Sequence, residues 1–436
     1  MKRLLPIFAL AAFLSAANGV RADVPELRRS GFLGVVVAPA AAPQHGLVVQ
    51  GLVDGSSAKE SELRPDDLIV KLDGRDVDAI AQFVQAARRL KAGEIARLEI
   101  ERGDASLTIP IRVKPKPFEQ AAAGSQVVYG AVEVDGHLRR TLLTAPADPG
   151  VARAPAILFA TGVGCFSQEI ASPRDSVAQL LHGLTAAGFV TMRVEKSSMG
   201  DSEGPACDSP EADLHAEVRG YVAGLRALKS NPRVDPAKVF IVGLSIGGVE
   251  APLVAHEEPV KGLVVINTVS KPFLEYLLET RRRQMQLRGR SPDEIEDQIA
   301  LEHTCNFQML VEKASPRDLV AREPECAEHI QYPAPYTYMQ EWAALNLARE
   351  WRSVTSPVLV IYGASDFVAT GADSPRLAGI INRFHPGLAT LREIEAMDHG
   401  MTKADSMAAS FAKTEPGDFQ PKVLEVMTQW LRGQGA

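Results

Sequence analysis

Residues 239–250 read VFIVGLSIGGVE, and this stretch decides the fold of the larger part of the chain. It begins with an apolar run typical of a buried strand and ends with residues typical of the start of a helix. Between them, Gly243, Ser245 and Gly247 form the pattern Gly-x-Ser-x-Gly, whose glycines relieve crowding around a tight strand-to-helix turn. The chain contains 34 glycines, so the pattern alone does not distinguish a projecting serine from a small residue in a bend. The surrounding sequence has to decide.

From residue 126 onward, further apolar runs alternate with segments of helical spacing. The runs APAILFATG, FVTMRVEKS, VKGLVVINT and PVLVIYGASD are apolar throughout, whereas DSVAQLLHGLTAAG and LHAEVRGYVAGLRAL have the spacing of helices. Strands of this kind are buried on both faces of a parallel sheet that helices cover. A hairpin that turns at Asp135-Gly136 precedes them. We therefore expect residues 126–436 to form an α/β domain with a mostly parallel sheet.

A charged segment, about residues 271–354, interrupts this alternation between two of the strands. Within it, Ser291-Pro292-Asp293-Glu294 is a capping box with proline at the first helical position, which predicts the start of a helix. A helical insertion at this point of the sheet is interpreted as a lid over the site. The alternative is a solvated helical decoration.

The sequence after Ser245 supplies a base and an acid. A serine hydroxyl is a weak nucleophile unless a base removes its proton, and the base needs an orienting carboxylate. Asp366 ends the stretch PVLVIYGASD, and His399 follows the strand ATLREIEAM, so both lie on loops after strands. His385 sits in a helix exit, and Asp398 adjoins His399 with its side chain directed elsewhere. We predict a catalytic triad of Ser245, Asp366 and His399.

Two backbone amides are candidates for holding the oxyanion that forms when a serine attacks a carbonyl. The Ile246 amide lies at the N-terminus of the helix after Ser245, where N–H groups lack an intrahelical partner. The loop after ILFATG is expected to supply the second donor. In that loop, Thr161-Gly162-Val163-Gly164, we assign the role to the Val163 amide.

The chain has four cysteines, and an even number allows two disulfides in three connectivities. Cys165 follows the glycine-rich loop, and Cys207 lies in the loop after the next strand, at the same end of the sheet. These positions favour a Cys165–Cys207 bridge and a Cys305–Cys326 bridge within the lid; four buried free thiols are the alternative. No C-x-x-C spacing is present, so we expect no zinc site and no thioredoxin-like centre. Acyl transfer to a serine needs no metal or organic cofactor, and we expect none.

From about residue 126 to the end, the chain resembles the α/β-hydrolases of the group that holds dienelactone-hydrolase-like esterases, acyl-thioesterases and prolyl-type aminopeptidases. The matching stretches are GLSIGGVEAPLVA and VEKSSMGDSEG, and the chain order Ser245, Asp366, His399 is the order of that fold. The second stretch departs from the family pattern D-K-R-G-x-G-x-S, since Ser197-Ser198 stands where the family has Arg-Gly. The resemblance implies an α/β-hydrolase fold and acyl transfer to Ser245.

Residues 30–112 predict a smaller α+β unit, which a Pro-then-Ala/Gly linker at 113–125 joins to the rest. Its stretches GFLGV and LRPDDLIVKLDG resemble the carboxylate-binding loop and the L-x-P-G-D-x-I stretch of PDZ domains of the bacterial, export-linked type. Asp66 departs from that pattern, which has glycine there.

The resemblance implies capture of a peptide C-terminus, with its carboxylate held by the backbone amides of Phe32, Leu33 and Gly34 and the peptide paired with the strand that follows. The alternative is a domain that only packs against its neighbour.

The N-terminus predicts export. Lys2 and Arg3 precede a short apolar stretch, and small residues lead to Ala22, so residues 1–22 are typical of a signal peptide that is removed. We expect a periplasmic or extracellular protein with no membrane span after cleavage. The formal net charge of -7 argues against a nucleic-acid partner.

These features lead to the hypothesis of an exported serine hydrolase that cleaves a carboxylic ester. One alternative is a serine aminopeptidase acting on short peptides, which predicts an acidic group in the lid that grips a free N-terminus. Glu275, Glu279 and the cluster Glu294–Asp297 are the candidates for that group. The other alternative is a peptide-binding protein whose hydrolase domain is inactive.

Overall fold

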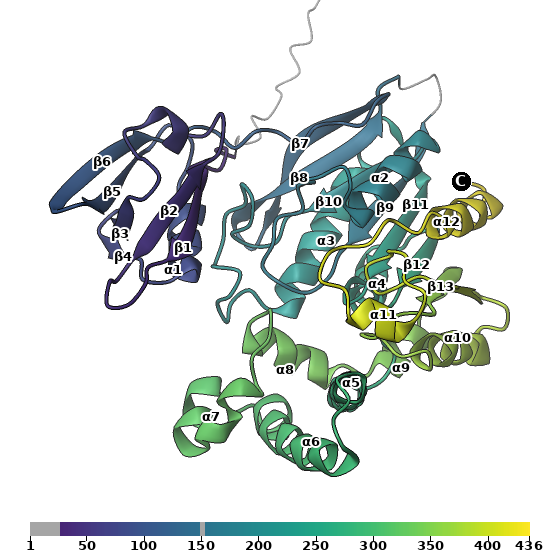
Figure 1. Cartoon of the computed structure of the whole chain (residues 1–436). Helices are drawn as coiled ribbons and strands as arrows, with labels where there is room; N and C mark the ends of the chain where they lie inside the picture. Colours follow the sequence, from purple (N-terminus) through teal and green to yellow (C-terminus); the bar gives the residue numbers. More distant parts are fainter. Residues whose placement is uncertain (1–26, 149–152) are drawn as a thin grey trace, which may run out of the picture.

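The computed structural model describes residues 27–148 and 153–436, which form two units that each contain one β-sheet (Figure 1). The predicted signal peptide, residues 1–22, lies outside the described residues. Within the described part, no helix combines the length and the apolar character needed to cross a membrane.

The N-terminal unit is a small antiparallel sheet with one α-helix. Its strands are β1 (Val35–Pro39), β2 (Leu47–Leu52), β3 (Leu68–Leu72), β4 (Arg75–Asp76), β5 (Ile95–Arg102) and β6 (Ala105–Arg112). They follow the order β1-β2-β3-β5-β6, and β4 pairs with β3. Helix α1 (Ile80–Arg88) places Phe83 in a core with Leu47, Ile69 and Leu98, so alternate strand residues and one helix face make a separate apolar centre.

The larger unit contains the mostly parallel sheet that the apolar runs predict. Its strands are β7 (Ser125–Val134), β8 (His137–Pro146), β9 (Ala154–Ala160), β10 (Val190–Val194), β11 (Val234–Leu244), β12 (Gly262–Ile266), β13 (Val358–Gly363) and β14 (Ala389–Ile394). Their order is β14-β13-β12-β11-β9-β10-β8-β7. The β7–β8 hairpin and the β8–β10 pair are antiparallel, and the other neighbours are parallel.

Helices cover both faces of this sheet, which is why its central strands are apolar on both faces. In β9, Ile157 and Phe159 belong to the core on one face, and Leu158 and Ala160 to the core on the other. Helices α2 (Ser176–Ala186) and α12 (Lys422–Gly433) cover the first face. The second face is covered by α3 (Leu214–Lys229), α4 (Gly247–Glu257) and α10 (Asp373–Phe384).

The segment between β12 and β13 is helical, and Figure 1 shows its helices gathered at one end of the larger unit. They are α5 (Phe273–Leu287), α6 (Pro292–Asn306), the π-helical turn η2 (Phe307–Val311), α7 (Pro316–Arg322), the 3-10 turn η3 (Pro324–Glu328), α8 (Tyr336–Ala344) and α9 (Leu347–Arg352). Ser291 caps α6 in the predicted capping box with Glu294. Phe273 stacks on Trp342 with ring centroids 4.1 Å apart, so the segment has its own aromatic core.

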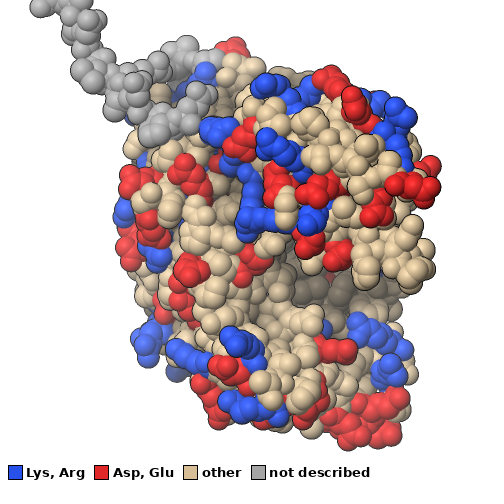
Figure 2. Space-filling view, turned by 90° about the vertical axis from the view of Figure 1, so that its left-hand side faces the viewer, with Lys and Arg blue, Asp and Glu red and all other residues tan. Residues whose placement is uncertain are grey.

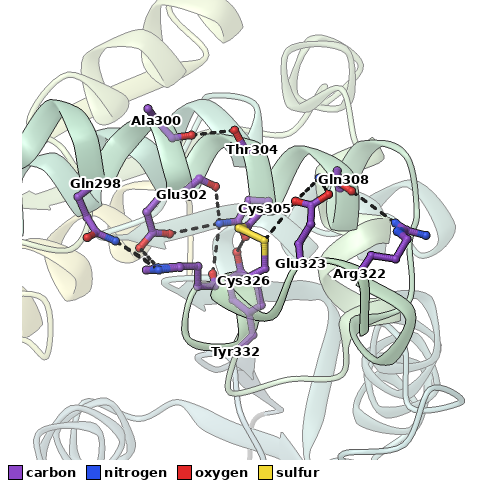
Figure 3. Close-up of a disulfide and its surroundings, with 12 residues drawn as sticks. Gln298, Ala300, Glu302, Thr304, Cys305, Gln308, Arg322, Glu323, Cys326 and Tyr332 are labelled. Carbon is purple, nitrogen blue, oxygen red and sulfur yellow. Dashed lines mark hydrogen bonds and ion pairs between the residues drawn. A yellow bond between two sulfur atoms is a disulfide. The ribbon is translucent and has the colours of Figure 1, made fainter. Parts of the chain in front are cut away.

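The disulfide Cys305–Cys326 ties α6 to η3, and polar bonds surround it (Figure 3). Tyr332 donates a hydrogen bond to the Asn306 side chain. The Asn306 amide in turn donates to the carbonyl of Glu302 at 2.8 Å. These contacts fix the end of α6 against the turn that follows it.

The stretch 113–125 is docked on the larger unit. Glu119 within it is fully buried and forms an ion pair with Arg193 of β10 at 2.8 Å, and it also accepts from the Ile170 amide at 2.8 Å. Arg29, just before the N-terminal sheet, pairs with Asp201 of the larger unit at 2.9 Å. Removing one partner of a buried pair leaves an uncompensated charge. The two units are therefore joined by charged contacts as well as by the chain.

Acidic and basic side chains are interspersed on the face of the molecule that carries the N-terminal unit (Figure 2). The same view shows the surface hollowed between the helical insertion, at the bottom, and the units above it.

Candidate active site

Ser245 stands on a strained turn between β11 and α4. Its φ angle is +56°, which lies in the left-handed region that side chains other than glycine rarely adopt. Its amide donates to the Ile266 carbonyl of β12 at 2.9 Å, and its carbonyl accepts from the Thr268 hydroxyl at 2.8 Å. The last residue of β12 and a residue of the loop after it therefore hold the strained conformation.

The glycines around Ser245 are required by close backbone contacts. A Cβ on Gly243 would lie 2.3 Å from the Gly247 carbonyl oxygen, and a Cβ on Gly247 would lie 2.3 Å from the Ala160 carbonyl oxygen of β9. A Cβ on Gly248 would meet the Thr268 hydroxyl at 2.5 Å. The first turn of α4 is thus pressed against the ends of β9, β11 and β12, and this packing explains the pattern.

His399 and Asp366 meet Ser245 in a chain of hydrogen bonds. The His399 Nε2 lies 3.1 Å from the Ser245 Oγ, and the His399 Nδ1 lies 2.8 Å from the Asp366 Oδ2. Asp366 follows β13, and His399 follows β14, so the three side chains come from loops after three parallel strands. These are the positions and contacts that a serine, a base and its orienting acid need.

Backbone amides fix the carboxylate of Asp366 beside His399. Its side chain is fully buried, and its Oδ1 accepts from the amides of Val368 at 2.7 Å and Ala369 at 3.0 Å. Burial lowers the pKa of His399, but the charge of Asp366 and its hydrogen bond raise it more, so the His399 pKa lies above its ordinary value. Asp366 therefore stabilises the imidazolium that would form during proton transfer.

Asn267 holds the loop that carries His399, and the sequence analysis did not find it. Its side-chain amide donates to the carbonyls of Asp398 at 2.9 Å and His399 at 3.0 Å, and its Oδ1 accepts from the Gly363 amide at 2.8 Å. Asn267 is fully buried and has a φ of +51°. An asparagine directly after a buried apolar strand is the only signal that sequence offers for it.

The other acid and histidine near the site have structural contacts. Asp398 points away from His399 and accepts from Lys413 at 2.7 Å and from the Thr402 hydroxyl at 2.7 Å. The Nε2 of His385 lies 3.0 Å from the Arg352 carbonyl. The structure thus places both where the sequence analysis expected them, outside the serine–histidine–aspartate chain.

The two expected oxyanion donors lie in loops at the ends of β9 and β11. Ile246 is the N-cap residue of α4, and Val163 lies three residues after β9. In the described part of the chain, neither amide donates to another protein group. The disulfide Cys165–Cys207, one of the two pairs that the sequence positions favoured, anchors the Val163 loop.

Helix α5 of the insertion touches the loop that carries Asp366. Thr280 donates to the Val368 carbonyl at 3.0 Å, and Arg283 donates to the carbonyls of Phe367 at 3.0 Å and Val368 at 2.8 Å. Buried residues of α5 also join the core on one face of the sheet. The insertion therefore borders the site and is more than a solvated decoration.

The acidic residues considered for gripping a peptide N-terminus are exposed or paired. Glu275 is exposed, Glu279 pairs with Lys271, and Glu294 caps α6. Within residues 27–148 and 153–436, no group of three or more His, Cys, Asp and Glu side chains is arranged to hold a metal ion.

The loop of the N-terminal unit differs from the expectation at one amide. The Phe32 amide donates to the Lys114 carbonyl at 2.8 Å, so it is not available to a carboxylate, and that part of the prediction is wrong. The amides of Leu33 and Gly34 have no acceptor within the described residues. Gly34 has a φ of +71°, and a Cβ there would lie 2.1 Å from the Ser56 Cβ. Two amides of the loop, rather than three, are therefore left without an acceptor among the described residues.

Comparisons with known proteins agree with this architecture. The model of the "Alpha/beta hydrolase family" matches residues 157–413, and the model of the "PDZ domain" matches residues 31–113. Esterase EstD of Thermotoga maritima is 21% identical over 283 residues, which are 64% of this chain and 62% of that protein. A probable periplasmic serine endoprotease DegP-like of Chlamydia pneumoniae is 28% identical over 107 residues, 22% of each chain. The chain thus spans less than two thirds of these relatives.

Solved structures show similar chains at low identity. Est1E from Butyrivibrio proteoclasticus with ferulic acid bound has a TM-score of 0.46 and 14% identity, over 70% of this chain and 98% of that one. The acylaminoacyl peptidase of Pyrococcus horikoshii has a TM-score of 0.46 and 11% identity, over 78% of this chain and 47% of that one. Because the family model covers more than half of its residues, the chain belongs to the alpha/beta hydrolase family, and a PDZ domain precedes its hydrolase domain.

Proposed function

We propose that the protein is a serine hydrolase that cleaves carboxylic esters. The observation that carries this proposal is the hydrogen-bonded chain from Ser245 through His399 to Asp366, at the ends of β11, β14 and β13. The similarity to EstD, a protein named as an esterase, supports the choice of bond.

In the proposed mechanism, His399 Nε2 removes the proton of the Ser245 hydroxyl while its oxygen attacks the acyl carbon. The negative charge moves to the former carbonyl oxygen, which the amides of Ile246 and Val163 hold. His399 then gives the proton to the departing alcohol. Water, deprotonated by the same histidine, then attacks the acyl carbon; the bond to the Ser245 oxygen breaks, His399 returns the proton to that oxygen, and the acid is released. Asp366 orients the imidazole throughout.

Esters are favoured over peptides by the charges of the lid. An aminopeptidase needs a buried acid near the site to grip the substrate ammonium group, and Glu275, Glu279 and Glu294 are exposed or engaged elsewhere. A binding protein with an inactive hydrolase domain has no need for an intact proton path between serine and acid. The geometry of His399 therefore supports activity.

Two assays test the proposal. A fluorophosphonate probe is expected to label the wild-type chain and not the Ser245→Ala variant. Nitrophenyl esters with short acyl chains and aminoacyl-anilides are then compared at equal enzyme concentration, and the esters are expected to turn over faster. If the wild-type chain does not react with the probe, the proposal that it is a hydrolase is wrong. If it cleaves the anilides faster than the esters, it is a peptidase and not an esterase.

We also propose that the PDZ domain binds the free C-terminus of a peptide. A groove of about 650 Å³ runs between β1 and α1, lined by apolar residues such as Val35, Ile80 and Val84. Leu33 and Gly34, whose amides have no acceptor among the described residues, also line it. Such a loop binds a carboxylate while the adjacent strand pairs with the peptide.

Export to an oxidising compartment is the proposed location. Two disulfides are typical of such compartments, and the DegP-like relative is named as periplasmic. Fractionation of cells that express the full chain tests this, and recovery with the cytoplasm would contradict it.

A further inference from the structure

Lys196 lies beneath the loop that contains Val163. It follows β10, its side chain is 4% exposed, and its Nζ donates to the Gly162 carbonyl at 2.8 Å. The same Nζ lies 2.9 Å from the Glu217 carboxylate of α3. A lysine is rarely buried this deeply without a partner for its charge. Here the Glu217 carboxylate pairs with the ammonium group of Lys196, and the same ammonium group donates a hydrogen bond to the backbone.

The Gly162 carbonyl and the Val163 amide belong to one peptide unit. In a planar trans peptide the C=O and N–H bonds point in opposite directions, so a group that fixes the carbonyl also fixes the direction of the N–H. A hydrogen bond from an ammonium group is stronger than one from a neutral donor, and it polarises the peptide so that its N–H becomes a better donor. Lys196 thus aims and strengthens the amide expected at the oxyanion.

The same cluster holds the residue before this peptide. Tyr221 donates to Glu217 at 3.2 Å, and its hydroxyl oxygen accepts from the Thr161 amide at 3.3 Å. The centroid of the Phe166 ring lies 5.1 Å from the Lys196 Nζ. The backbone is therefore fixed immediately before Val163, and a cation lies under it.

We propose that Lys196 is the positioning residue of the oxyanion-binding loop. It touches no substrate and acts through the Gly162–Val163 peptide. This inference rests on the proposed hydrolase function. It gives a role to Lys196 in the stretch VEKSSMGDSEG. This lysine matches the family pattern D-K-R-G-x-G-x-S, whereas Ser197 and Ser198 after it do not.

The first test is steady-state kinetics of the full chain with a short-chain nitrophenyl ester. Lys196→Met removes the donor and the charge but keeps the length of the side chain. We expect kcat, normalised to the serine that a fluorophosphonate titrates, to fall about a hundredfold, the loss typical of one oxyanion donor, with KM within threefold. Lys196→Arg keeps the charge and a donor, so we expect its kcat to be at least tenfold higher than that of Lys196→Met.

The second test uses a trifluoromethyl ketone, which forms a tetrahedral adduct on the serine. Its Ki is expected to rise in Lys196→Met by the factor by which kcat/KM falls, because both report on the tetrahedral oxyanion. If Lys196 had only a structural role, Lys196→Met would lower the fraction of chains whose serine reacts with the fluorophosphonate and would lower the melting temperature. It would leave kcat per active site unchanged. Lys229→Met is the matched control, since Lys229 also pairs with a glutamate at 2.6 Å but lies on α3 facing Glu258.

The outcomes separate this inference from the proposed function. If the wild type neither reacts with the fluorophosphonate nor hydrolyses the ester, the proposed hydrolase function is wrong. An active wild type with unchanged normalised kcat in Lys196→Met overturns the role of Lys196 alone. Should the methionine variant fail to fold, Lys196→Gln decides: kcat within threefold of the wild type in that shorter, uncharged variant contradicts the proposal, and a loss of tenfold or more that Lys196→Arg reverses supports it.

A second, independent observation concerns the groove of the PDZ domain, because the hydrolase domain forms one of its walls. Alongside β1 and α1, the groove is lined by Phe166, Ser167 and the loop Ser198–Gly200. Ser30 connects the walls, since its amide donates to Asp201 at 2.8 Å and its hydroxyl donates to the Gly200 carbonyl. The side chain of Phe166 is 40% exposed.

We infer that a peptide held by its C-terminal carboxylate in this groove contacts the hydrolase domain. Such a peptide would touch Phe166, the residue over Lys196. The occupant is a free carboxylate with an apolar last side chain, because Leu33 and Gly34, whose amides have no acceptor among the described residues, line an apolar groove that Arg88 and Lys116 also line. Neither domain alone contains all of this site.

The test measures binding of the full chain to peptides that differ in their last residue, with all twenty residues sampled. The tightest peptide is expected to bind at least tenfold more weakly as its C-terminal amide, and Phe166→Ser is expected to weaken it about fivefold. Phe384→Ser, which removes a phenylalanine 48% exposed on α10, is the control. The inference is overturned if no peptide prefers the free acid, or if Phe166→Ser binds as tightly as the wild type.

Discussion

Two loops of this molecule carry backbone amides that have no acceptor among the described residues, and the two loops are held differently. In the PDZ domain, the amides of Gly31 and Phe32 donate to the carbonyls of Leu90 and Lys114, and the amides of Leu33 and Gly34 have no acceptor among the described residues. Main-chain bonds to residues just outside the helix and strands therefore hold this loop, with one further bond from the Ser57 hydroxyl to the Phe32 carbonyl at 2.6 Å.

The hydrolase loop after β9 is held by side chains and a disulfide. Lys196 binds the Gly162 carbonyl, the Tyr221 hydroxyl binds the Thr161 amide, and Cys165 is bonded to Cys207. The comparison teaches that a glycine-rich motif identifies an amide loop, while distant residues decide which amides remain available. It also predicts that changes to one loop's supports impair one activity and spare the other.

The largest effect is expected where the hydrolase site loses its acid. Asp366→Asn keeps the size of a side chain that is fully buried and bonded to His399. The amide would favour the wrong imidazole tautomer, so kcat should fall about ten-thousandfold. Ester kinetics measure this, with peptide affinity of the PDZ groove as the control. A loss below tenfold would show that another group orients His399.

Asn267→Ala is expected to have the next largest effect on hydrolysis. It removes both donors that hold the carbonyls of Asp398 and His399 and places alanine at a φ of +51°. A displaced base costs rate even when the chemistry is intact, so we expect kcat to fall about a hundredfold. Thermal melting, recorded alongside, separates this from unfolding. If the folded variant has the kcat of the wild type, Asn267 is not needed to position His399.

Gly34→Ala tests the other loop. A Cβ there would lie 2.1 Å from the Ser56 Cβ, at a φ of +71° that alanine rarely adopts. The loop should shift, and binding of a C-terminal peptide should weaken about tenfold, while ester kcat stays within twofold. Gly55→Ala, which has open space around a φ of +77°, is the matched control for backbone strain. Equal losses in both variants would mean that strain, not the loop, sets the affinity.

The smallest effect concerns pH. Burial lowers the His399 pKa, but Asp366 raises it further, so the pKa in the folded chain lies above 6.5. A base must be neutral, so kcat/KM should rise with pH through that pKa, and its midpoint should fall in Asp366→Asn. The same shift stabilises the fold below pH 6.5, and this contribution is lost as pH rises through the folded pKa. A midpoint below 6.5 in the wild type would contradict this environment for His399.

The sequence predicts the elements of both domains where local chemistry dominates. Strands apolar on both faces require a covered parallel sheet, and the glycines around Ser245 mark the turn because the backbone there allows no Cβ. Asp366 and His399 follow from their positions after strands, and the Ser291 capping box follows from local hydrogen bonding.

Contacts between residues far apart in the chain could not be predicted in this way. Asn267 meets the His399 loop across 132 residues, and Lys196 meets Gly162 only because β10 lies beside β9. The engaged Phe32 amide and the buried Glu119 likewise depend on partners that no short motif specifies. These contacts decide which atoms remain available for binding and catalysis.

The central claim is that Ser245 is the nucleophile of a working triad. The most direct measurement is mass spectrometry of the full chain after reaction with a fluorophosphonate, followed by mapping of the modified peptide. We predict one adduct per chain, on Ser245. We expect no adduct in Ser245→Ala, and slower formation of the adduct in Asp366→Asn than in the wild type. An unmodified wild-type chain, or an adduct on another serine, would contradict the account.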